Sequence, residues 1–449
     1  MSRTLSRGEP LAFGAPEVGE TVDIRIDSAK PHQTLLGLGS SLEHTTCWNL
    51  WRLSPERRAE ALERLVSREN GIGMNLMRIC IGTPDFTGEP WYSYDDMPPG
   101  ETDEALEHFS IEKDLAYVIP VLKLALEKNP DLLFYASPWS PPGWMKTSDD
   151  LIGGHLYPKY YGVYARYFLK FIRAYEAQGI PIHAVTIQNE PGVNTRDHPK
   201  SWWYPSCQWS LVVDEDTWFP PSLDIMGHPE RDFIRDHLGP LFKEQGVKTR
   251  IWCYDHNLNN LWYPRAILSD PIAGRYVDGT AFHPYSGAPS DMGAFWKEFP
   301  DKKVYLSEGS MFGIEGAVSI IEYLRNGASS YNAWVTLIDS EGKPNNGPFK
   351  ASKTCVMLDS GTLEVTHGFE YYMYGQFMKF IHRGAVRIDS GESGSEFAHV
   401  AFLNPDGSLV LVVANPLSRS RDFRVGWEGS TFRGVIGPES VATYRWRAN

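Results

Sequence analysis

The chain has 449 residues, of which 42% are hydrophobic and 22% are charged, a composition that excludes a disordered or collagen-like protein. Its formal net charge is −13 and no run of basic residues occurs, so we expect neither a nucleic-acid partner nor attachment to an anionic membrane surface. No segment approaches the roughly 18 consecutive apolar residues of a membrane-spanning helix, so stable membrane insertion is not expected either.

The N-terminus and the cysteines bear on where the protein resides. The first residues, MSRTLSRGEPLAFG, contain no apolar stretch of the length found in signal peptides. Five cysteines are scattered along the chain without a C-x-x-C pair, which fits a reducing compartment better than a disulfide framework and gives no zinc-binding spacing. We therefore expect a cytoplasmic protein without a metal or other cofactor, while the sequence leaves its oligomeric state open.

Short β-type segments recur eight times along the chain, and each is followed by a helical pattern. Strands that alternate with helices indicate parallel βαβ units. Eight such units in succession favour a closed (β/α)₈ barrel, of the α/β class, over an open sheet. The eight segments are residues 35–40, 74–82, 132–139, 183–190, 249–257, 277–285, 303–310 and 329–339.

Two of the intervening helices are marked clearly by their ends. In the segment SPERRAEALERLVSRE, Ser54 is placed to cap the helix, Pro55 occupies its first position, and apolar residues recur on one face. A second helix is predicted within YPKYYGVYARYFLKFIRAYEAQG, where Gly179 ends it.

The pattern changes near residue 385 to alternating strands. The segments VRIDSGE, FAHVAFLNPDGSLVLVVANP, RDFRVGW and SVATYRWR indicate an antiparallel β-domain, with the turn sequence Asn-Pro-Asp-Gly at 404–407 joining two of its strands. A lone strand at 22–28 precedes the barrel and cannot bury one face alone, so we place it in the same β-domain. The predicted organisation is an N-terminal strand segment (1–32) that joins the β-sandwich, a catalytic barrel (33–384) and a C-terminal β-sandwich (385–449).

Two glutamates lie where the active site of such a barrel is expected. Catalytic groups of (β/α)₈ barrels sit at the C-terminal ends of the strands, and Glu190 and Glu308 end the fourth and seventh predicted strands. Each follows an apolar run, so burial at the rim of the barrel can raise the pKa of its carboxyl group. Two carboxylates that face one pocket are what glycoside hydrolysis requires, because one protonates the leaving oxygen while the other attacks C1 or activates water.

The aromatic content is high, with 15 Trp, 22 Tyr and 21 Phe. Large rings dominate cores, and they also stack on the apolar faces of sugars, so composition alone leaves both interpretations open. The segment 192–222 carries five Trp and Tyr residues and fits either an aromatic lid over the leaving-group side or a simple cover for the barrel mouth. These residues are Trp202, Trp203, Tyr204, Trp209 and Trp218.

The motifs of the chain resemble one known family over nearly the whole length. The segments MRICIGTPDF, ASPWSPPGWMKT, AVTIQNEP, HPERDFIRDHLGP, DGTAFHPY, YLSEGS and NPDGSLVLVVANP are similar to those of glycoside hydrolase family 30, the group that includes lysosomal glucosylceramidase. The resemblance implies a (β/α)₈ barrel fused to a β-sandwich that takes in an N-terminal strand, which agrees with the organisation read from the strand and helix patterns.

The resemblance also implies roles for the two glutamates and one neighbour. Glu190 of the N-E-P motif corresponds to the acid/base, and Glu308 of L-S-E-G corresponds to the nucleophile of a retaining enzyme. Asn189 is implied to hydrogen-bond the 2-OH of the sugar, an interaction that strengthens in the transition state.

Five further residues are implied to bind substrate. Asp85 is expected to hold hydroxyl groups on the far side of the sugar, Trp139 and Trp334 to wall the −1 subsite, and Tyr285 to lie near the nucleophile. His283, at a strand end, fits either a ligand contact or a structural hydrogen-bonding role.

Departures from the family pattern leave the sugar and the aglycone open. The first barrel strand carries Ser-Ser-Leu-Glu-His at 40–44 where the family often has G-G-x-x-T-D, and Pro284 stands where an aromatic residue is common. The segment after Trp334 lacks the usual asparagine. The expected substrate is therefore a carbohydrate or glycoside of undetermined identity, and the two-glutamate chemistry is unaffected.

The expected function is retaining hydrolysis of β-linked glucosides, or closely related β-xylosides or β-fucosides, from the non-reducing end. Exo action is favoured because a carboxylate such as Asp85 accepts hydrogen bonds from the free 4-OH and 6-OH of a terminal sugar and becomes unpaired if another sugar is attached. An endo-acting β-1,6-glucanase or xylanase is the alternative. A non-catalytic carbohydrate-binding barrel is disfavoured because binding requires no proton donor, and a metal-dependent hydrolase because no strand-end cluster has ligand spacing.

Overall fold

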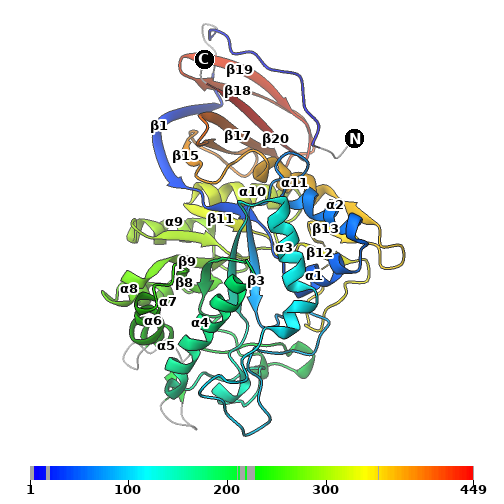
Figure 1. The fold of residues 1–449 in the computed structure, drawn as a ribbon. Helices are drawn as coiled ribbons and strands as arrows, with labels where there is room; N and C mark the ends of the chain where they lie inside the picture. The colour runs from blue at the N-terminus through cyan, green and yellow to red at the C-terminus, as the bar shows by residue number, and fades with distance from the viewer. Residues whose placement is uncertain are drawn as a thin grey trace.

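The computed structural model describes residues 5–16, 21–209, 211–212, 218–219, 228–351 and 353–447. The chain forms two units, a helix-covered barrel and a smaller domain of strands, which lie one above the other in Figure 1. The N-terminal strand β1 (Ile24–Thr34, dark blue) runs along the smaller domain, beside strands from the C-terminal end of the chain.

Each of the eight predicted barrel segments contains a strand, so the prediction of a (β/α)₈ barrel is confirmed. The strands pair in parallel in the order β2-β11-β10-β9-β8-β5-β4-β3. The ring closes where the N–H groups of Asn75 and Arg78, in or next to β3, donate to carbonyl groups of Leu38 and Ser40, in or next to β2, both at 2.9 Å. The strands are β2 (Gly37–Gly39), β3 (Leu76–Ile81), β4 (Leu133–Pro138), β5 (Ile182–Thr186), β8 (Arg250–Asn257), β9 (Val277–His283), β10 (Lys303–Leu306) and β11 (Ala328–Asn332).

The helices pack around the barrel, and the two predicted from their ends are confirmed. In α2 the Ser54 side chain accepts from the Arg57 N–H, and Leu62 and Val66 are buried. Helix α4 ends just before Gly179, whose φ of +80° suits glycine. The helices are α1 (His44–Trp51), α2 (Pro55–Val66), α3 (Val118–Lys128), α4 (Tyr161–Ala177), α5 (Pro229–Phe233), a π-helical turn (Ile234–Leu238), α6 (Gly239–Glu244), α7 (Trp262–Leu268), α8 (Ala273–Tyr276), α9 (Pro289–Glu298), α10 (Gly313–Arg325) and α11 (Phe369–Met378).

The eighth segment differs from the prediction of one strand over 329–339. The barrel strand β11 stops at Asn332, and the chain leaves the barrel through Trp334 before β12 (Leu337–Asp339) begins. There β12 pairs with β13 (Val356–Leu358), which pairs in turn with β14 (Val365–His367). The continuous apolar run in the sequence therefore belongs to two sheets.

Aromatic side chains fill the barrel interior and form a floor below the next layer of inward-facing residues. Tyr135, Trp252 and Tyr305 are fully buried, and the rings of Trp252 and Tyr305 stack with centroids 3.9 Å apart. Side chains alternate along a strand with a period of two, so residues two positions further along β3, β4, β5, β9 and β10 face the same interior one layer higher. That layer holds Arg78, Ser137, Thr186, His283 and Ser307, and all of these are polar.

The smaller domain is an antiparallel β-sandwich, as predicted, and β1 belongs to both of its layers. β1 pairs in parallel with β18 at one edge and antiparallel with β15 at the other. Ile24 and Ile26 of β1 are buried in the core between the layers, and the turn at 404–407 joins two strands as expected, with Gly407 at φ +77°. The other strands are β15 (Val386–Asp389), β16 (Ala398–Leu403), β17 (Ser408–Asn415), β18 (Arg421–Trp427), β19 (Ser430–Ile436) and β20 (Ser440–Arg447).

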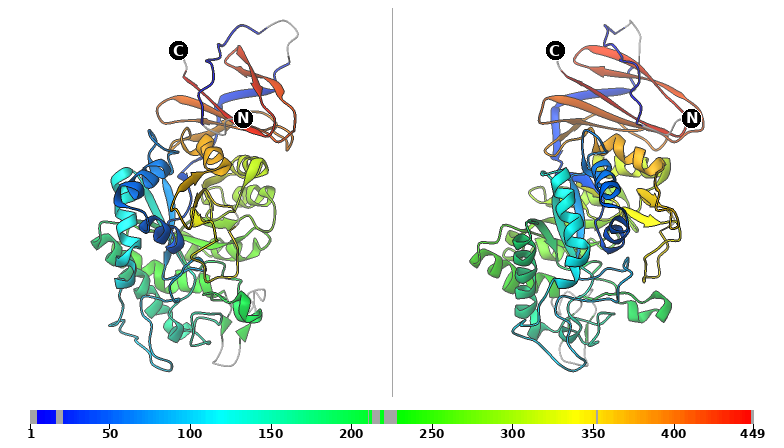
Figure 2. Two further views of the ribbon diagram at one scale, coloured as in Figure 1. Left: turned by 90° about the vertical axis from the view of Figure 1, so that its right-hand side faces the viewer. Right: turned by 45° about the vertical axis from the view of Figure 1, so that its right-hand side comes forward.

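The two units meet along the last helices of the barrel. In Figure 2, α11 (orange) lies where the barrel adjoins the β-sandwich. The Thr443 hydroxyl of β20 donates to the Gln376 carbonyl of α11 at 2.6 Å, and the Arg325 guanidinium at the end of α10 donates to Ser390 at 2.9 Å.

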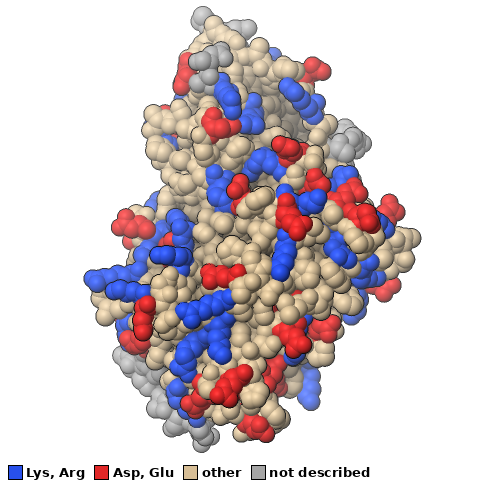
Figure 3. Space-filling view, viewed as in Figure 1, with Lys and Arg blue, Asp and Glu red and all other residues tan. Residues whose placement is uncertain are grey.

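Figure 3 shows acidic and basic side chains interspersed over both units on the face drawn. Within the described part of the chain, no helix has both the length and the apolar character that crossing a membrane would require.

Barrel closure leaves no room for a side chain at Gly39 of β2, and this gives a stability prediction. A Cβ atom added to Gly39 would lie 1.9 Å from the Leu76 carbonyl oxygen, so Gly39→Ala should lower the free energy of unfolding by roughly 1–3 kcal/mol or more. Gly394→Ala is the control, since its added Cβ atom meets nothing within 4 Å and should change that free energy by less than about 0.5 kcal/mol. Urea unfolding of both variants measures the difference, and equal midpoints would contradict the closure argument.

Candidate active site

Glu190 follows β5 at the C-terminal end of the barrel, in a fixed and unusual backbone conformation. Its φ is +53°, a region that non-glycine residues rarely adopt, and its N–H donates to the Asp255 carbonyl at 3.0 Å. The preceding N–H, of Asn189, donates to the Pro138 carbonyl at 2.8 Å. The Asn-Glu pair is thereby held by the ends of β4 and β8.

Glu308 follows β10 and is almost completely buried, with 6% of its surface exposed. One carboxylate oxygen accepts a hydrogen bond from the Tyr285 hydroxyl at 2.9 Å, and the other accepts from the guanidinium of Arg78. Charge-assisted hydrogen bonds of this kind fix the position of a carboxylate.

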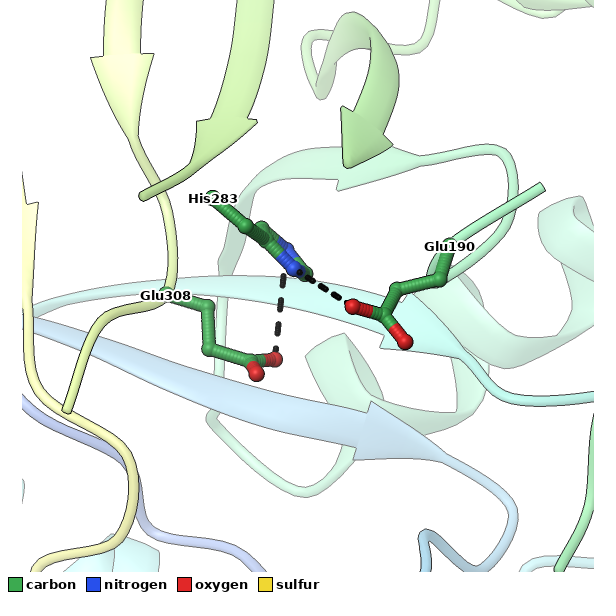
Figure 4. Close-up of side chains that lie close together, drawn as sticks. All are labelled: Glu190, His283 and Glu308. Carbon is green, nitrogen blue, oxygen red and sulfur yellow. Dashed lines mark hydrogen bonds and ion pairs between the residues drawn. The ribbon is translucent and has the colours of Figure 1, made fainter. Parts of the chain in front are cut away.

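The two glutamates face each other across His283 (Figure 4). One oxygen of each carboxylate and one nitrogen of the imidazole ring all lie within 4.8 Å of one another. Nδ1 of His283 is 3.2 Å from Glu190, and Nε2 is 3.1 Å from Asp255 and 3.9 Å from Glu308. Burial lowers the pKa of His283, but the surrounding carboxylates Glu308, Asp255 and Glu190 outweigh burial and raise it to about 10.

This trio also has a spacing that could hold a metal ion. Both ring nitrogens of His283 already have carboxylate partners, Nδ1 with Glu190 and Nε2 with Asp255. In this structure the cluster is a hydrogen-bonded network of one imidazole and its carboxylates.

A buried arginine in the middle of β3 organises the layer below the glutamates. The guanidinium of Arg78 donates to Glu308, to Asn189 at 2.8 Å, to Asp255 at 2.7 Å and to Ser137 at 3.2 Å. The rigid donor fork of arginine suits such simultaneous contacts, which place the two site residues Asn189 and Glu308 relative to each other.

Asp255 is the partner of this arginine and the most heavily hydrogen-bonded carboxylate of the site. It accepts from Ser137 at 2.9 Å, Thr186 at 2.8 Å and Ser307 at 2.6 Å, in addition to Arg78 and His283. Burial raises its pKa, but Arg78, His283 and Ser307 outweigh burial and hold the pKa well below its usual range. Asp255 is thus a permanent anion within the barrel.

A cavity of about 760 Å³ opens above this network. Buried residues line its interior, while Trp202 and Phe349, which are 49% and 41% exposed, stand at its mouth. The size and the mixture of aromatic and polar lining suit one small ligand group with its orientation fixed by few polar contacts. The lining includes Asp85, Phe86, Trp139, Asn189, Glu190, Tyr204, His256, Tyr285, Glu308, Phe312 and Trp334.

Asp85 and two tryptophans form one wall of the cavity. Asp85 is 4% exposed, its Oδ1 atom has no hydrogen-bond partner, and burial together with the charges of Glu308 and Glu190 raises its pKa well above the usual range. An unpaired buried carboxyl group is costly, so this atom is suited to a ligand hydroxyl. The rings of Trp139 and Trp334 stack with centroids 5.1 Å apart, and Arg78 lies 4.8 and 5.4 Å from them.

Comparison with known proteins gives the family. The model of the glycosyl hydrolase family 30 TIM-barrel domain matches residues 35–380, and the model of the family's β-sandwich domain matches residues 384–444. The chain belongs to glycoside hydrolase family 30. It is therefore an enzyme of the glycoside hydrolase class, as its paired carboxylates predict.

Similar family 30 proteins cover almost the whole chain. An endo-1,6-β-D-glucanase of Neurospora crassa is 30% identical over 96% of this chain and 89% of its own length, and the lysosomal acid glucosylceramidase of Mus musculus is 29% identical over 97% and 85%. Among solved structures, SrfJ from Salmonella typhimurium has a TM-score of 0.87 at 26% identity, covering 98% of this chain and 95% of its own. An endo-β1,6-glucanase structure has a TM-score of 0.85 at 27% identity, covering 98% and 96%.

The family 30 site brings together the residues predicted from the sequence, with one difference in placement. Seven of the eight line the cavity, whereas His283 is fully buried behind the glutamates and contacts their carboxylates instead. Of the two roles open to His283 from the sequence, the structure therefore provides the structural hydrogen bonds. The seven are Asp85, Trp139, Asn189, Glu190, Tyr285, Glu308 and Trp334.

Three residues of this site were missed by the sequence reasoning. Arg78 lies in the apolar run LMRICI, where a charged residue on a buried strand is itself a signal, and Asp255 and His256 end the fifth predicted strand in the same way that Glu190 ends the fourth. The Nε2 atom of His256 lies 3.8 Å from Glu190. Burial raises the pKa of Glu190, but His256 and His283 outweigh burial and lower it. Burial lowers the pKa of His256, while the neighbouring Glu190 carboxylate acts in the opposite direction.

The aromatic segment 192–222 divides between the cavity and the core. Trp202 and Tyr204 line the cavity, whereas Trp209 is buried against Phe233, with ring centroids 5.4 Å apart. The side chain of Trp218 lies outside the described residues.

The Tyr285 hydroxyl gives a direct test of this geometry. Tyr285→Phe removes one of the two charged hydrogen bonds to Glu308, so kcat on an aryl β-glucoside should fall roughly 10- to 100-fold. Because Tyr285 is 47% exposed, the midpoint of thermal unfolding should stay within about 2 °C. Tyr372→Phe, on α11 away from the cavity, is the matched control and should retain full activity. An unchanged kcat in Tyr285→Phe would show that this hydrogen bond plays no part in turnover.

Proposed function

We propose that the enzyme hydrolyses β-linked glucosides with retention of configuration, with Glu190 as acid/base and Glu308 as nucleophile. The observation that carries the proposal is the approach of the two carboxylates, whose nearest oxygens lie within 4.8 Å. Double displacement requires carboxyl groups roughly 5–5.5 Å apart, whereas inversion requires about 6.5–9.5 Å so that water fits between them.

The surroundings of the two carboxylates support different roles. Glu308 receives hydrogen bonds from Arg78 and Tyr285, which hold its carboxylate in place at the cavity. Glu190 is held through Oε1 by His283, and no described residue hydrogen-bonds its second oxygen. A carboxyl group with one free oxygen facing a cavity can exchange a proton with a substrate.

The proposed reaction has two displacement steps. In the first, a Glu308 oxygen forms a bond to C1 while the bond from C1 to the leaving oxygen breaks and that oxygen takes the proton of Glu190. In the second, Glu190 takes a proton from water, the water oxygen bonds to C1, and the bond between C1 and Glu308 breaks. Asn189, held by Arg78 beside the nucleophile, is placed to bind the 2-OH of the sugar.

Exo action is supported by the closed wall at Asp85. The loop after β12 packs against this wall, where the Gly347 N–H donates to the Asp85 carbonyl at 3.0 Å and the Asn346 N–H donates to the Thr87 carbonyl at 2.8 Å. The free Oδ1 of Asp85 suits the hydroxyl groups of a terminal sugar, and a further sugar at that position would leave it buried and unpaired.

Endo action on a β-1,6-glucan is the second candidate, and a different observation favours it. Trp202 and Phe349 at the mouth of the cavity contact each other edge to face, with centroids 5.8 Å apart, and both present exposed ring surface. Such rings can stack on further sugars on the leaving-group side. Two of the similar proteins described above, including one of known structure, are endo-1,6-β-glucanases.

A cytoplasmic location stays a proposal, which the cysteines support. All five cysteines are buried and unpaired. Unpaired thiols of this kind are typical of a reducing compartment.

The roles of the glutamates can be separated by their variants. Glu308→Ala should abolish turnover of an aryl β-glucoside, and added azide should restore part of it as an α-glycosyl azide, because azide fills the space of the missing nucleophile and inverts C1 in a single displacement. Glu190→Ala should lose roughly 10²- to 10⁴-fold on poor leaving groups and far less on activated ones, because only poor leaving groups need protonation. Equal losses on all leaving groups in Glu190→Ala, or a β-glycosyl azide product from Glu308→Ala, would reverse or reject the assignment.

The products from a series of β-linked gluco-oligosaccharides distinguish exo from endo action. The Asp85 wall predicts that glucose is released singly from the non-reducing end from the earliest time points, whatever the length of the chain. Chromatography of the products of β-1,6-linked oligosaccharides labelled at the reducing end measures this. Early formation of mixed oligomers, with glucose appearing late, would make endo-1,6-β-glucanase activity the correct description.

A further inference from the structure

Strand β8 departs from regular alternation in its second half. Trp252 belongs to the aromatic floor, so a regular strand would turn Tyr254 into the polar layer above it. Instead Asp255 occupies that layer, and the Tyr254 ring packs outward against Tyr263, with centroids 5.3 Å apart. A shift of one residue along β8 therefore turns the carboxylate of Asp255 into the barrel.

The shift is a β-bulge with a strained backbone. In the pairing of β8 with β9, Tyr254 aligns with Ala281 and His256 with Phe282, so one extra residue, Asp255, lies between them. Tyr254 and Asp255 have φ values of +77° and +61°, in the left-handed region that costs energy for residues other than glycine. Neighbouring contacts must hold such a conformation in place.

A buried glutamate outside the cavity provides the contact. β5 pairs with β8 only as far as Trp252, and the Tyr254 N–H beyond that point donates to Oε1 of Glu230 at 2.8 Å. Glu230 lies on α5, is fully buried and is absent from the cavity lining. A buried N–H without an acceptor is strongly disfavoured, so the bulge depends on this carboxyl group.

We propose that Glu230 is a positioning residue, which fixes the β8 bulge and so places Asp255 and His256 against the catalytic glutamates. Five site contacts originate in Asp255 and the two residues that follow it. The Asp255 carboxylate binds Arg78 and His283, and the Asp255 carbonyl accepts the Glu190 N–H. His256 lies 3.8 Å from Glu190, and the Asn257 side chain accepts the Tyr285 N–H at 3.2 Å.

The protonation state of Glu230 predicts which substitutions should preserve the bulge. Burial raises the pKa of Glu230 to about 8, so the group is mainly a neutral acid at pH 7 that accepts through one oxygen. An amide of the same shape keeps that acceptor, whereas an aliphatic side chain of similar size removes it. Glu230→Gln should therefore behave like the parent enzyme, and Glu230→Leu should not.

The experiment measures kcat, KM and the pH dependence of kcat/KM on an activated and a poor aryl β-glucoside. Glu230→Gln should stay within about twofold of the parent enzyme, while Glu230→Leu should lose up to about 10²-fold in kcat, because small misplacements of reacting groups have effects of that size. The loss should be larger for the poor leaving group.

The pH profile supplies a readout that a purely structural role would not move. Glu190 is faced by His256 from β8, His283 from β9, Arg78 from β3, Glu308 after β10, and Tyr204 and Asp85 from the cavity wall. The histidines lower the pKa of Glu190, so their displacement in Glu230→Leu should move the alkaline limb of kcat/KM to higher pH.

Glu43 offers a matched control. It is a second fully buried carboxyl group with a pKa raised by burial, and it accepts a backbone N–H, that of Thr46 at 2.8 Å, to cap α1. Glu43→Leu should lower the midpoint of thermal unfolding as Glu230→Leu does, yet leave kcat and the alkaline limb unchanged.

Three results would overturn the proposal: a folded Glu230→Leu variant with parental kcat and pH profile, a Glu230→Gln variant as impaired as Glu230→Leu, or an equal loss of kcat in Glu43→Leu. If Glu230→Leu does not fold, Glu230→Asp, whose shorter carboxyl group cannot reach the Tyr254 N–H, is judged by the same criteria.

The proposal rests on the role of Glu190, which Glu190→Gln checks separately. An alkaline limb that persists in Glu190→Gln rejects that role, while the kcat ratio between Glu230→Gln and Glu230→Leu still decides the role of Glu230.

Discussion

The buried ion pair between Arg78 and Asp255 is the interaction on which the catalytic end of the barrel depends. Both side chains are removed from water, at a cost of several kcal/mol for each ion that only close pairing and further hydrogen bonds offset. Those further bonds are the site itself, because Arg78 also holds Glu308 and Asn189, and Asp255 also holds His283. The geometry of the cavity floor therefore follows from the need to pair and hydrogen-bond two buried ions. Removal of either ion would leave the other buried without its partner.

The barrel and most of its cavity could be predicted because they follow from local rules. Strand and helix periodicity is repeated eight times, so an error in one segment does not change the architecture, and the side chains at strand ends must converge at one mouth. That rule alone brings Glu190 and Glu308 together from positions more than a hundred residues apart in sequence. The eighth segment was the exception, because its apolar run continues through Trp334 into a second sheet and periodicity cannot show where one sheet stops.

The remaining parts of the site could not be predicted because they depend on exceptions to those rules. Alternation along β8 predicts that Tyr254 faces inward, and only the bulge turns Asp255 into the barrel. The acceptor that stabilises the bulge, Glu230, comes from another part of the chain, and nothing in its local sequence indicates the N–H it binds. The placement of His283 behind the glutamates, rather than in the cavity, likewise depends on how many carboxylates surround it and not on its position at a strand end.

The balance of charge in the polar layer supports the change of role that the proposed mechanism asks of Glu190. Two cations, Arg78 and His283, face two anions, Asp255 and Glu308, so these four charges balance when Glu190 is protonated, while the neighbouring histidines lower the pKa of Glu190 and favour its anion. When Glu308 becomes esterified to C1 it loses its charge, and the cations are in excess. Excess positive charge within a few ångströms favours the ionised form of a carboxyl group, so Glu190, after giving its proton to the leaving group, remains an anion. An anionic Glu190 is the base that the second step requires, and the same buried network therefore serves both halves of the reaction.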